Sequence, residues 1–201
     1  MPDWMIVLAG YLLGSLPFAL LVARRHAGID PRLRGSGNVG AANVQRLAGT
    51  WPGVAVLVLD VAKGLGAVWL AQAAGGGEAL RAACGLSAIV GHVYPVWLRF
   101  RGGKGVAVAC GAFAALMPAV TAGAVALFTL VVWATRLVSL GSLVATVTLP
   151  VAAYASGRPL PAVAAASAAA ALIVFRHRSN IARLRAGTER RLGERFDPLA
   201  Q

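Results

Sequence analysis

The chain has 201 residues, of which 58% are apolar and 13% are charged, whereas soluble domains average about 45–50% apolar and about 25% charged residues. This composition, with a mean hydropathy of +0.72, excludes a disordered chain and argues against an ordinary soluble domain. The net charge of +12 is typical of nucleic-acid-binding proteins, but such a domain would not consist mostly of Ala, Val, Leu and Gly. The two cysteines, Cys84 and Cys110, exclude a disulfide scaffold and a four-cysteine zinc site. We therefore predict a small polytopic membrane protein.

Apolar blocks separated by short polar segments predict an all-α fold in which one membrane-embedded domain, residues 1–201, contains seven transmembrane helices. The first block begins with Asp3 instead of a basic residue, so we expect a retained span and not a cleaved signal. Pro118 leaves two possibilities for residues 105–135, one long kinked helix or two short ones. The predicted spans are approximately 3–23, 52–74, 80–98, 105–118, 119–135, 139–156 and 159–175.

The basic residues predict the orientation of these spans. With seven spans, 16 of the 19 Lys and Arg residues fall on one side, Arg81 and Arg158 fall on the other, and Lys63 lies inside a span. Because basic loops stay in the cytoplasm, the N-terminus is expected outside and residues 176–201 are expected to form a cytoplasmic tail. The same asymmetry explains the net charge without nucleic acid.

Three segments on the predicted cytoplasmic side carry most of the polar chemistry. They are residues 34–46 (RGSGNVGAANVQR), residues 91–105 (GHVYPVWLRFRGGKG) and residues 176–189, which include His177, Asn180 and Glu189. Their convergence on one face, deduced from charge counting, predicts a single site there.

The first segment contains a literal GxGxxG, Gly35-Ser36-Gly37-Asn38-Val39-Gly40. A dinucleotide site would require a preceding strand in a βαβ unit, whereas an apolar span and an Arg-rich loop precede this motif. Glycines do expose backbone N–H groups, which can form a cradle for an anion. Residues 102–105, Gly-Gly-Lys-Gly, repeat the device with a cation built in, which predicts two phosphate sites; tight turns and helix packing are the alternative use of these glycines.

Several polar residues have two interpretations each. Lys104 is either a phosphate-binding point charge or a topology anchor, and the Asp60/Lys63 pair is either structural or functional. His177 and Asn180 are three residues apart and can share a ligand, whereas His92 is a candidate for capping the Tyr94-Pro95 turn. Because the chain has only seven acidic residues, a carboxylate metal cluster is not expected, and no cofactor is expected either. The His-x-x-x-x-Asp signature of common acyltransferases is missing.

The chain resembles the bacterial acyl-phosphate:glycerol-3-phosphate acyltransferases of the PlsY type, in order and over nearly its full length. The resemblance rests on residues 35–46, Asp60-x-x-Lys63-Gly64, Gly91-His92-x-x-Pro95, residues 100–107, Ser139-Leu140-x-Ser142, and residues 177–189. Ala42 is a departure, because the family often carries Thr there.

The resemblance implies transfer of an acyl group from acyl phosphate to the 1-hydroxyl of glycerol 3-phosphate, giving lysophosphatidic acid and phosphate, as the first step of bacterial phospholipid synthesis. It implies a multi-pass inner-membrane enzyme, expected to be monomeric, with its site facing the cytoplasm and without an acyl-CoA requirement. The expected catalytic residues are Ser36, Arg46, Lys104, His177 and Asn180. The expected substrate-binding residues are Gly35, Gly37, Asn38, Gly40, Ala41, Asn43, Gly102, Gly103, Gly105 and Ser142. The base is expected to be His177 or a substrate phosphate oxygen.

Two other classes of function use similar features. A transporter or channel for a phosphorylated solute would share the cationic lining, but it should show an internal repeat and broken helices at the membrane midplane, which the sequence does not indicate. A non-catalytic lipid-binding protein would leave the two predicted anion cradles unexplained.

Overall fold

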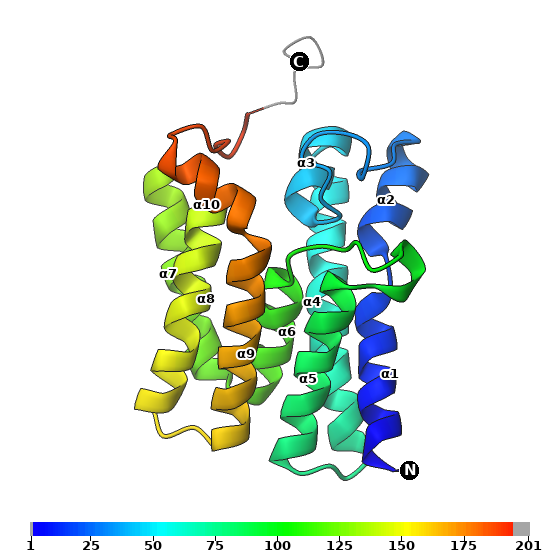
Figure 1. The fold of residues 1–201 in the computed structure, drawn as a ribbon, viewed down its shortest axis with the longest axis vertical. Coiled ribbons are helices and arrows are strands. Elements are labelled where there is room, and N and C mark those ends of the chain that lie inside the picture. Colours follow the sequence, from blue (N-terminus) through cyan, green and yellow to red (C-terminus); the bar gives the residue numbers. More distant parts are fainter. Residues whose placement is uncertain (1, 195–201) are drawn as a thin grey trace.

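A computed structural model describes residues 2–194, which form ten α-helices, one short 3-10 helix and no strand. The all-α expectation is confirmed. The helices α1 and α4–α9 run along the long axis of the molecule, and α2, α3 and α10 lie at one end (Figure 1). The elements are α1 Asp3–Ser15, α2 Phe18–Ala27, α3 Ala41–Ala48, α4 Thr50–Ala73, α5 Glu78–Val93, η1 Val96–Leu98, α6 Val106–Leu116, α7 Pro118–Thr135, α8 Val138–Ala155, α9 Leu160–Arg176 and α10 Arg178–Arg185.

Prolines mark two breaks between helices, one inside the first predicted span and one between the fourth and fifth. Residues 3–23 are not one helix, because Pro17 separates α1 from α2. Residues 105–135 form two helices, with the break at Met117 and Pro118 as the first residue of α7. Proline suits that position because the first helical N–H has no intrahelical partner. Of the two possibilities for residues 105–135, the second is therefore confirmed.

The number of membrane crossings is less regular than predicted. Five segments of the described chain are long and apolar enough to cross a membrane, with α1 and α2 counted as one, and the bent pair α9–α10 makes a sixth. α6 has 11 residues and is about 16 Å long, against a hydrocarbon core of about 30 Å. Seven helical segments match the seven predicted spans, but seven complete crossings and their orientation stay a prediction.

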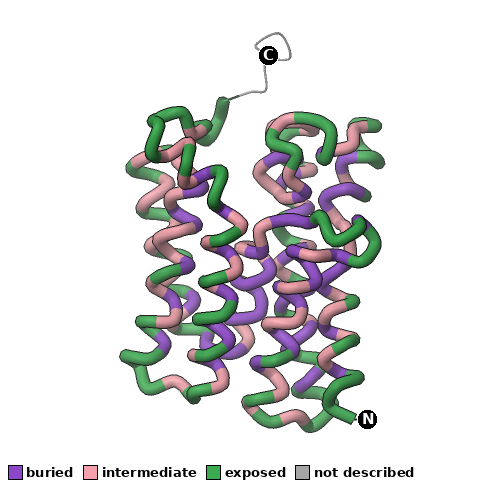
Figure 2. Tube along the Cα trace, in the orientation of Figure 1, coloured by how far each residue is buried: buried purple, intermediate pink, exposed green. Residues whose placement is uncertain are grey.

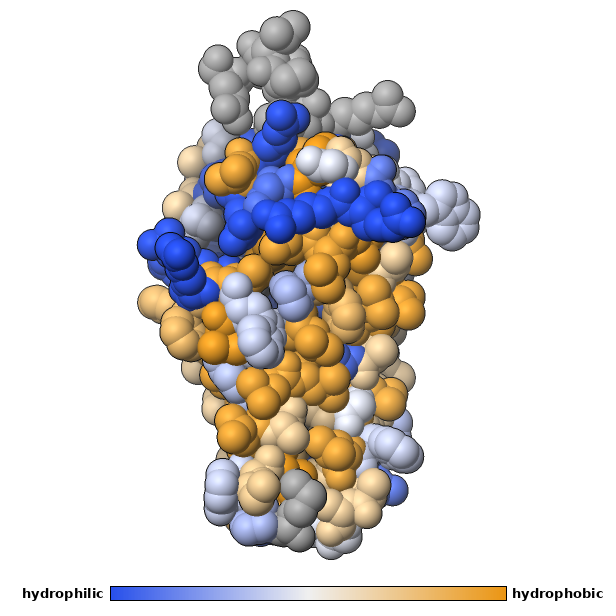
Figure 3. Space-filling view, turned by 90° about the vertical axis from the view of Figure 1, so that its right-hand side faces the viewer, coloured by the Kyte–Doolittle hydropathy of each residue, from blue (hydrophilic) through white to orange (hydrophobic). Residues whose placement is uncertain are grey.

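Polar residues gather at one end of the molecule. Figure 3 shows hydrophilic side chains at the end that carries α2, α3 and α10, above an apolar body. The start of α5 and the α8–α9 loop, which contain Arg81 and Arg158, lie at the opposite end (Figure 1). The predicted separation of the basic residues is therefore present in the fold.

Small residues bring the central helices close together. A Cβ on Gly14 of α1 would lie 2.1 Å from the Ala88 carbonyl oxygen of α5, and a Cβ on Gly64 of α4 would lie 2.1 Å from that of Val108 on α6. Because glycine has no side chain at these positions, the helix backbones approach each other closely, as they do in membrane helix bundles. Buried residues concentrate on α4, α5 and α6 (Figure 2), whereas α7 has a single buried residue, Thr121. The short helix α6 is thus held in the centre, with its N-terminus directed toward the polar end.

Candidate active site

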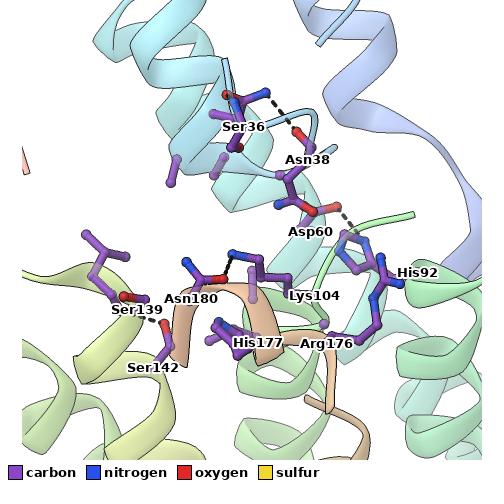
Figure 4. Close-up of a pocket in the computed structure, with 18 of the residues that line it drawn as sticks. Ser36, Asn38, Asp60, His92, Lys104, Ser139, Ser142, Arg176, His177 and Asn180 are labelled. Atoms are coloured by element: carbon purple, nitrogen blue, oxygen red, sulfur yellow. Dashed lines mark hydrogen bonds and ion pairs between the residues drawn. The ribbon is translucent and has the colours of Figure 1, made fainter. Parts of the chain in front are cut away.

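A cavity of about 1550 Å³ lies between α3 and α4 on one side and α7, α8 and α10 on the other, with the N-terminus of α6 in its wall. The three polar segments predicted to converge do converge on it (Figure 4). Its lining includes every predicted site residue except Gly103. These are Gly35, Ser36, Gly37, Asn38, Gly40, Ala41, Asn43, Arg46, Gly102, Lys104, Gly105, Ser142, His177 and Asn180.

The polar part of the cavity is strongly cationic. Nine basic residues of the described chain line it, against the two acidic residues Asp60 and Glu189. The basic ones are Arg32, Arg46, Arg99, Arg101, Lys104, Arg176, Arg178, Arg183 and Arg190. First-turn residues of α3, α6, α8 and α10 also contribute to the wall, and helix N-termini add positive potential and N–H donors. The site is therefore built to bind anions.

Lys104 and Asn180 join two of the three segments. The Nζ of Lys104 donates to Oδ1 of Asn180 across 2.6 Å (Figure 4). The Nδ2 of Asn180 donates to Oε1 of Glu189 at 2.6 Å, and Nε of Arg183 donates to Oε2 of the same carboxylate at 2.7 Å. Glu189 is thus an anchor that orients the Asn180 amide, and Asn180 in turn orients Lys104.

Burial changes the protonation equilibria at this point. It lowers the pKa of Lys104 to about 8, with Glu189 acting in the opposite direction. Burial, with the nearby Arg190, also lowers the pKa of Arg46. Burial alone would raise the pKa of Glu189, but hydrogen bonds from Asn180 and Arg183 outweigh it and the pKa is lowered. A neutral to mildly alkaline pH therefore keeps an anionic Glu189 beside a lysine that is close to its titration point.

Asn43 shapes the first loop. Its buried side chain accepts a hydrogen bond from the Ser36 N–H at 3.0 Å, and it donates to the carbonyls of Pro31 at 2.9 Å and Asn38 at 3.0 Å. Gly35 and Gly37 adopt positive φ values of 64° and 68° in this loop, conformations that favour glycine. Asn43, predicted to bind substrate, is therefore mainly a clasp that holds the loop in shape.

The free backbone donors of the first segment lie at the start of α3. Gly40 precedes this helix and provides no side-chain cap. The N–H groups of Ala41 and Ala42 have no intrahelical partner because they belong to the first turn, and both residues line the cavity. Here the predicted anion cradle has a structural basis, whereas the N–H groups of Ser36 and Gly37 already donate to Asn43 Oδ1 and the Arg34 carbonyl.

The second glycine loop differs from expectation. The N–H groups of Gly102 and Gly103 donate to the carbonyls of Val93 and His92, each at 3.0 Å, so they hold a turn and are not available to a phosphate. Arg176 reinforces the turn by donating to the carbonyls of Gly102 at 3.1 Å and Gly103 at 3.3 Å. Anion binding through these two amides was therefore a wrong expectation. Lys104 and Gly105, whose φ is +90°, remain in the wall.

His177 lies at the break between α9 and α10. Its Nδ1 is 2.8 Å from the Ile173 carbonyl oxygen, and because a carbonyl accepts, Nδ1 must carry the proton. In the neutral ring Nε2 is then the basic nitrogen. His177 and Asn180 both line the cavity, as their spacing predicted.

Farther along α4, α6, α7 and α8 the lining of the cavity is mostly apolar, with Thr121 and Thr146 among it. Leu57 and Val61 of α4, Ala109 of α6, Ala124, Val125 and Phe128 of α7, and Ala145 and Leu149 of α8 form this arm. Leu57 and Val125 are exposed. The cavity therefore combines a cationic chamber with an arm suited to a hydrocarbon chain.

Comparison with known proteins identifies the family. The model of the family described as "Glycerol-3-phosphate acyltransferase" matches residues 4–187. The chain belongs to this family. A glycerol-3-phosphate acyltransferase of Rubrobacter xylanophilus is 46% identical over 195 residues, which cover 97% of this chain and 98% of that protein. One of Geobacter sulfurreducens is 43% identical over 189 residues, 94% and 97% of the two chains.

Solved structures agree with this glycerol-3-phosphate acyltransferase assignment. The crystal structure of PlsY, an integral membrane glycerol 3-phosphate acyltransferase, in its glycerol 3-phosphate form superposes with a TM-score of 0.91. It has 38% sequence identity and covers 95% of this chain and 96% of that one. A second form of the same enzyme, with lysophosphatidic acid, gives a TM-score of 0.86 at 37% identity. The resemblance noted from the sequence motifs is thereby confirmed.

Two contributors to the site of this acyltransferase were not assigned roles from the sequence. Arg176 belonged to the third polar segment without a role of its own, although it fixes the 102–103 turn and its guanidinium lies 5.9 Å from the centre of the Tyr94 ring. Glu189 was part of the third motif but had no role. The sequence does carry an indication of its role, because Glu189 is the single acidic residue among the arginines of residues 176–191. Within residues 2–194 no cluster of three His, Cys, Asp or Glu side chains has a metal-binding arrangement.

Proposed function

We propose that the chain transfers an acyl group from acyl phosphate to the 1-hydroxyl of glycerol 3-phosphate, yielding lysophosphatidic acid and phosphate. The observation that carries this proposal is the two-part cavity, in which a cationic chamber lined by nine basic residues continues into an apolar arm. Acyl phosphate requires both parts, because it has an anionic head and a hydrocarbon tail. Glycerol 3-phosphate requires only the chamber.

The acceptor binds at the junction of the second and third segments. Arg46, Lys104, His177 and Asn180 line this part of the chamber, and an incoming phosphate can replace Asn180 as the acceptor for the Lys104 ammonium. Lysine is suited to this exchange because it is a compact charge on a flexible stem. The similar PlsY crystal structure in its glycerol 3-phosphate form supports this choice of acceptor.

The donor phosphate binds at the start of α3. The N–H groups of Ala41 and Ala42 and the Ser36 hydroxyl are available there, and Gly35 and Gly37 keep the loop open. Ser142 faces the same cavity from α8, although its hydroxyl already donates to the Val138 carbonyl at 2.9 Å. The acyl chain extends into the apolar arm.

The reaction proceeds by direct transfer. The oxygen of the glycerol 1-hydroxyl attacks the acyl carbonyl carbon, the bond from that carbon to the phosphate oxygen breaks, and phosphate leaves with the electron pair. The hydroxyl proton passes to Nε2 of His177 or to a substrate phosphate oxygen. Phosphate is a good leaving group, so no enzyme nucleophile is needed, and positioning with electrostatic stabilisation supplies the acceleration.

The cationic end faces the cytoplasm in this proposal. The gathering of basic loops at the end that carries α2, α3 and α10 supports it. We propose a monomer in the bacterial inner membrane, because one chain supplies all the residues used above. The product carries a single acyl chain, which fits the first step of phospholipid synthesis.

The test uses purified protein in detergent with acyl phosphate and glycerol 3-phosphate. We expect lysophosphatidic acid and inorganic phosphate in equal amounts, and no product when acyl-CoA replaces acyl phosphate. Release of phosphate without lysophosphatidic acid, or turnover with acyl-CoA alone, would contradict the proposed reaction. Movement of glycerol 3-phosphate into vesicles without chemistry would favour a transporter.

A further inference from the structure

A buried charged cluster lies directly behind the Lys104 loop. Asp60 and Lys63 are one turn apart on α4, and each is at most 3% exposed. The Nζ of Lys63 is 2.9 Å from Oδ1 of Asp60, 2.9 Å from Nδ1 of His92 on α5 and 3.1 Å from the Leu16 carbonyl oxygen. An ammonium has three protons, so all three donors of Lys63 are used.

This arrangement determines the protonation of His92. Because Lys63 can only donate, Nδ1 of His92 must accept, and the ring is then neutral with its proton on Nε2. Asp60 lies 3.6 Å from the same nitrogen (Figure 4), which is an electrostatic contact beyond hydrogen-bond length. The cluster therefore holds the imidazole in one tautomer and one orientation.

His92 contacts the loop that carries Lys104. Its carbonyl accepts the Gly103 N–H at 3.0 Å. Its ring lies against the same residue, because a Cβ on Gly103 would be 2.1 Å from Nε2 of His92. The residue next in the chain is Lys104, whose Nζ reaches Asn180. Contacts therefore run without a gap from Asp60 and Lys63 through His92 and Gly103 to the cationic chamber.

The cluster also fastens the break between α1 and α2. The helix is interrupted at Pro17, so the Leu16 carbonyl does not accept the Leu20 N–H as it would in a continuous helix; it accepts the Phe18 N–H at 3.1 Å and the Lys63 ammonium at 3.1 Å. The Lys63 ammonium lies 5.7 Å from the centre of the Phe18 ring at the start of α2. One lysine thus ties together α4, α5 and the α1–α2 break.

We propose that Asp60 and Lys63 are positioning residues that act through His92 to hold the Gly102–Lys104 turn where Lys104 binds glycerol 3-phosphate. The inference rests on the proposed function only for the identity of that ligand. A pair that merely stabilised α4 would need neither the His92 contact nor the packing of His92 on Gly103. The consequence is that its loss weakens binding of the acceptor more than binding of the acyl donor.

The first test removes both charges together, because Lys63→Met alone would leave a buried Asp60 without its cation and destabilise the fold. The double variant Asp60→Asn/Lys63→Met is purified in detergent and checked by size-exclusion chromatography. We expect at least a tenfold rise in both the KM and the Kd for glycerol 3-phosphate, the Kd being measured by thermal shift without turnover. The KM for acyl phosphate should change less than twofold.

A second variant tests the route through His92. In His92→Asn the shorter amide can still accept from Lys63 but no longer reaches Gly103, and we expect the same rise in the KM and Kd for glycerol 3-phosphate. The control is Glu78→Gln/Arg81→Met, which removes a second one-turn ion pair of the described residues, at the far end of the molecule, and should leave both constants unchanged.

Wild-type constants for glycerol 3-phosphate in the folded double variant, or in His92→Asn, would overturn the proposal. So would a rise in both substrate constants by the same factor. Wild-type protein that binds glycerol 3-phosphate but makes no lysophosphatidic acid would contradict the proposed function alone, because the Kd comparison would still report on positioning.

Discussion

Lys104 and Asn180 are 76 residues apart in the chain, yet Nζ of the first donates to Oδ1 of the second across 2.6 Å. This contact closes the chamber between the loop before α6 and the helix α10. Without substrate, Asn180 accepts the hydrogen bond from Lys104 that a substrate phosphate can accept in its place.

Replacement of Lys104 by alanine should abolish most activity. We expect kcat/KM for glycerol 3-phosphate to fall at least about 10²-fold, comparable with the loss of one preorganised donor to a reacting anion. The variant should elute normally in detergent, because the half-buried Lys104 side chain lines the cavity. Near-normal turnover would make Lys104 a topology anchor.

The pH dependence should follow the same residue. Burial lowers the pKa of Lys104 to about 8, so the free enzyme has the ammonium below that pH and loses it above. We expect kcat/KM for glycerol 3-phosphate to decline as pH rises through about 8. Lys104→Arg should remove this decline, because arginine stays protonated, with a pKa above about 12. A wild-type profile that stays flat to pH 9.5 would refute the assignment.

Asn43 should be needed for the shape of the first loop. Asn43→Ala leaves the Ser36 N–H and the Pro31 and Asn38 carbonyls without this partner, at about 1–3 kcal/mol for each group that stays buried and unpaired. A melting temperature lower by about 4 °C or more is expected, with reduced kcat/KM for both substrates. Asn43→Asp keeps the acceptor for Ser36 and should retain more activity than alanine; equal activity in the two would argue against the clasp.

Gly103 and Gly123 form a matched pair of substitutions. A Cβ on Gly103 would collide with His92, whereas a Cβ on Gly123 of α7 meets nothing within 4 Å. Gly103→Ala should therefore lose activity at least about tenfold, and Gly123→Ala should keep it while gaining up to about 1 kcal/mol of helix stability. Activity assays and thermal melts of both proteins check this, and a fully active Gly103→Ala protein would show that the turn can move without consequence.

The apolar arm should accommodate the acyl chain. Ala145→Phe places a ring in the arm, so the KM for a long-chain acyl phosphate should rise more than that for a short-chain one. Val147→Phe, on an exposed part of the same helix, is the control and should change neither value. Equal effects of Ala145→Phe on both donors would place the chain elsewhere.

Much of the fold and site could be predicted from local pattern. The lengths of the apolar blocks predicted the helices from α4 to α9 to within about five residues, but not the division of the first span into α1 and α2. The charge asymmetry predicted that His177, Lys104 and Ser36 lie at one end of the molecule. The sequence context argued against a dinucleotide site at the GxGxxG motif. The structure agrees, because the helix α2 and not a strand precedes the motif.

What could not be predicted depends on contacts distant in sequence. The N–H groups of Gly102 and Gly103 are consumed by carbonyls of the preceding turn, which glycine content alone does not reveal. The role of Lys63 requires His92, 29 residues away, and the Leu16 carbonyl, 47 residues away. Pro17 could have indicated the break in the first span, but the prediction of a single helix over residues 3–23 relied on their high hydropathy.

The most direct measurement is a structure of this chain with glycerol 3-phosphate bound. We predict that the phosphate lies within about 3.2 Å of Nζ of Lys104 and of the Arg46 guanidinium, with the 1-hydroxyl directed toward the start of α3. A phosphate bound outside this chamber, with Lys104 still donating to Asn180, would contradict the account.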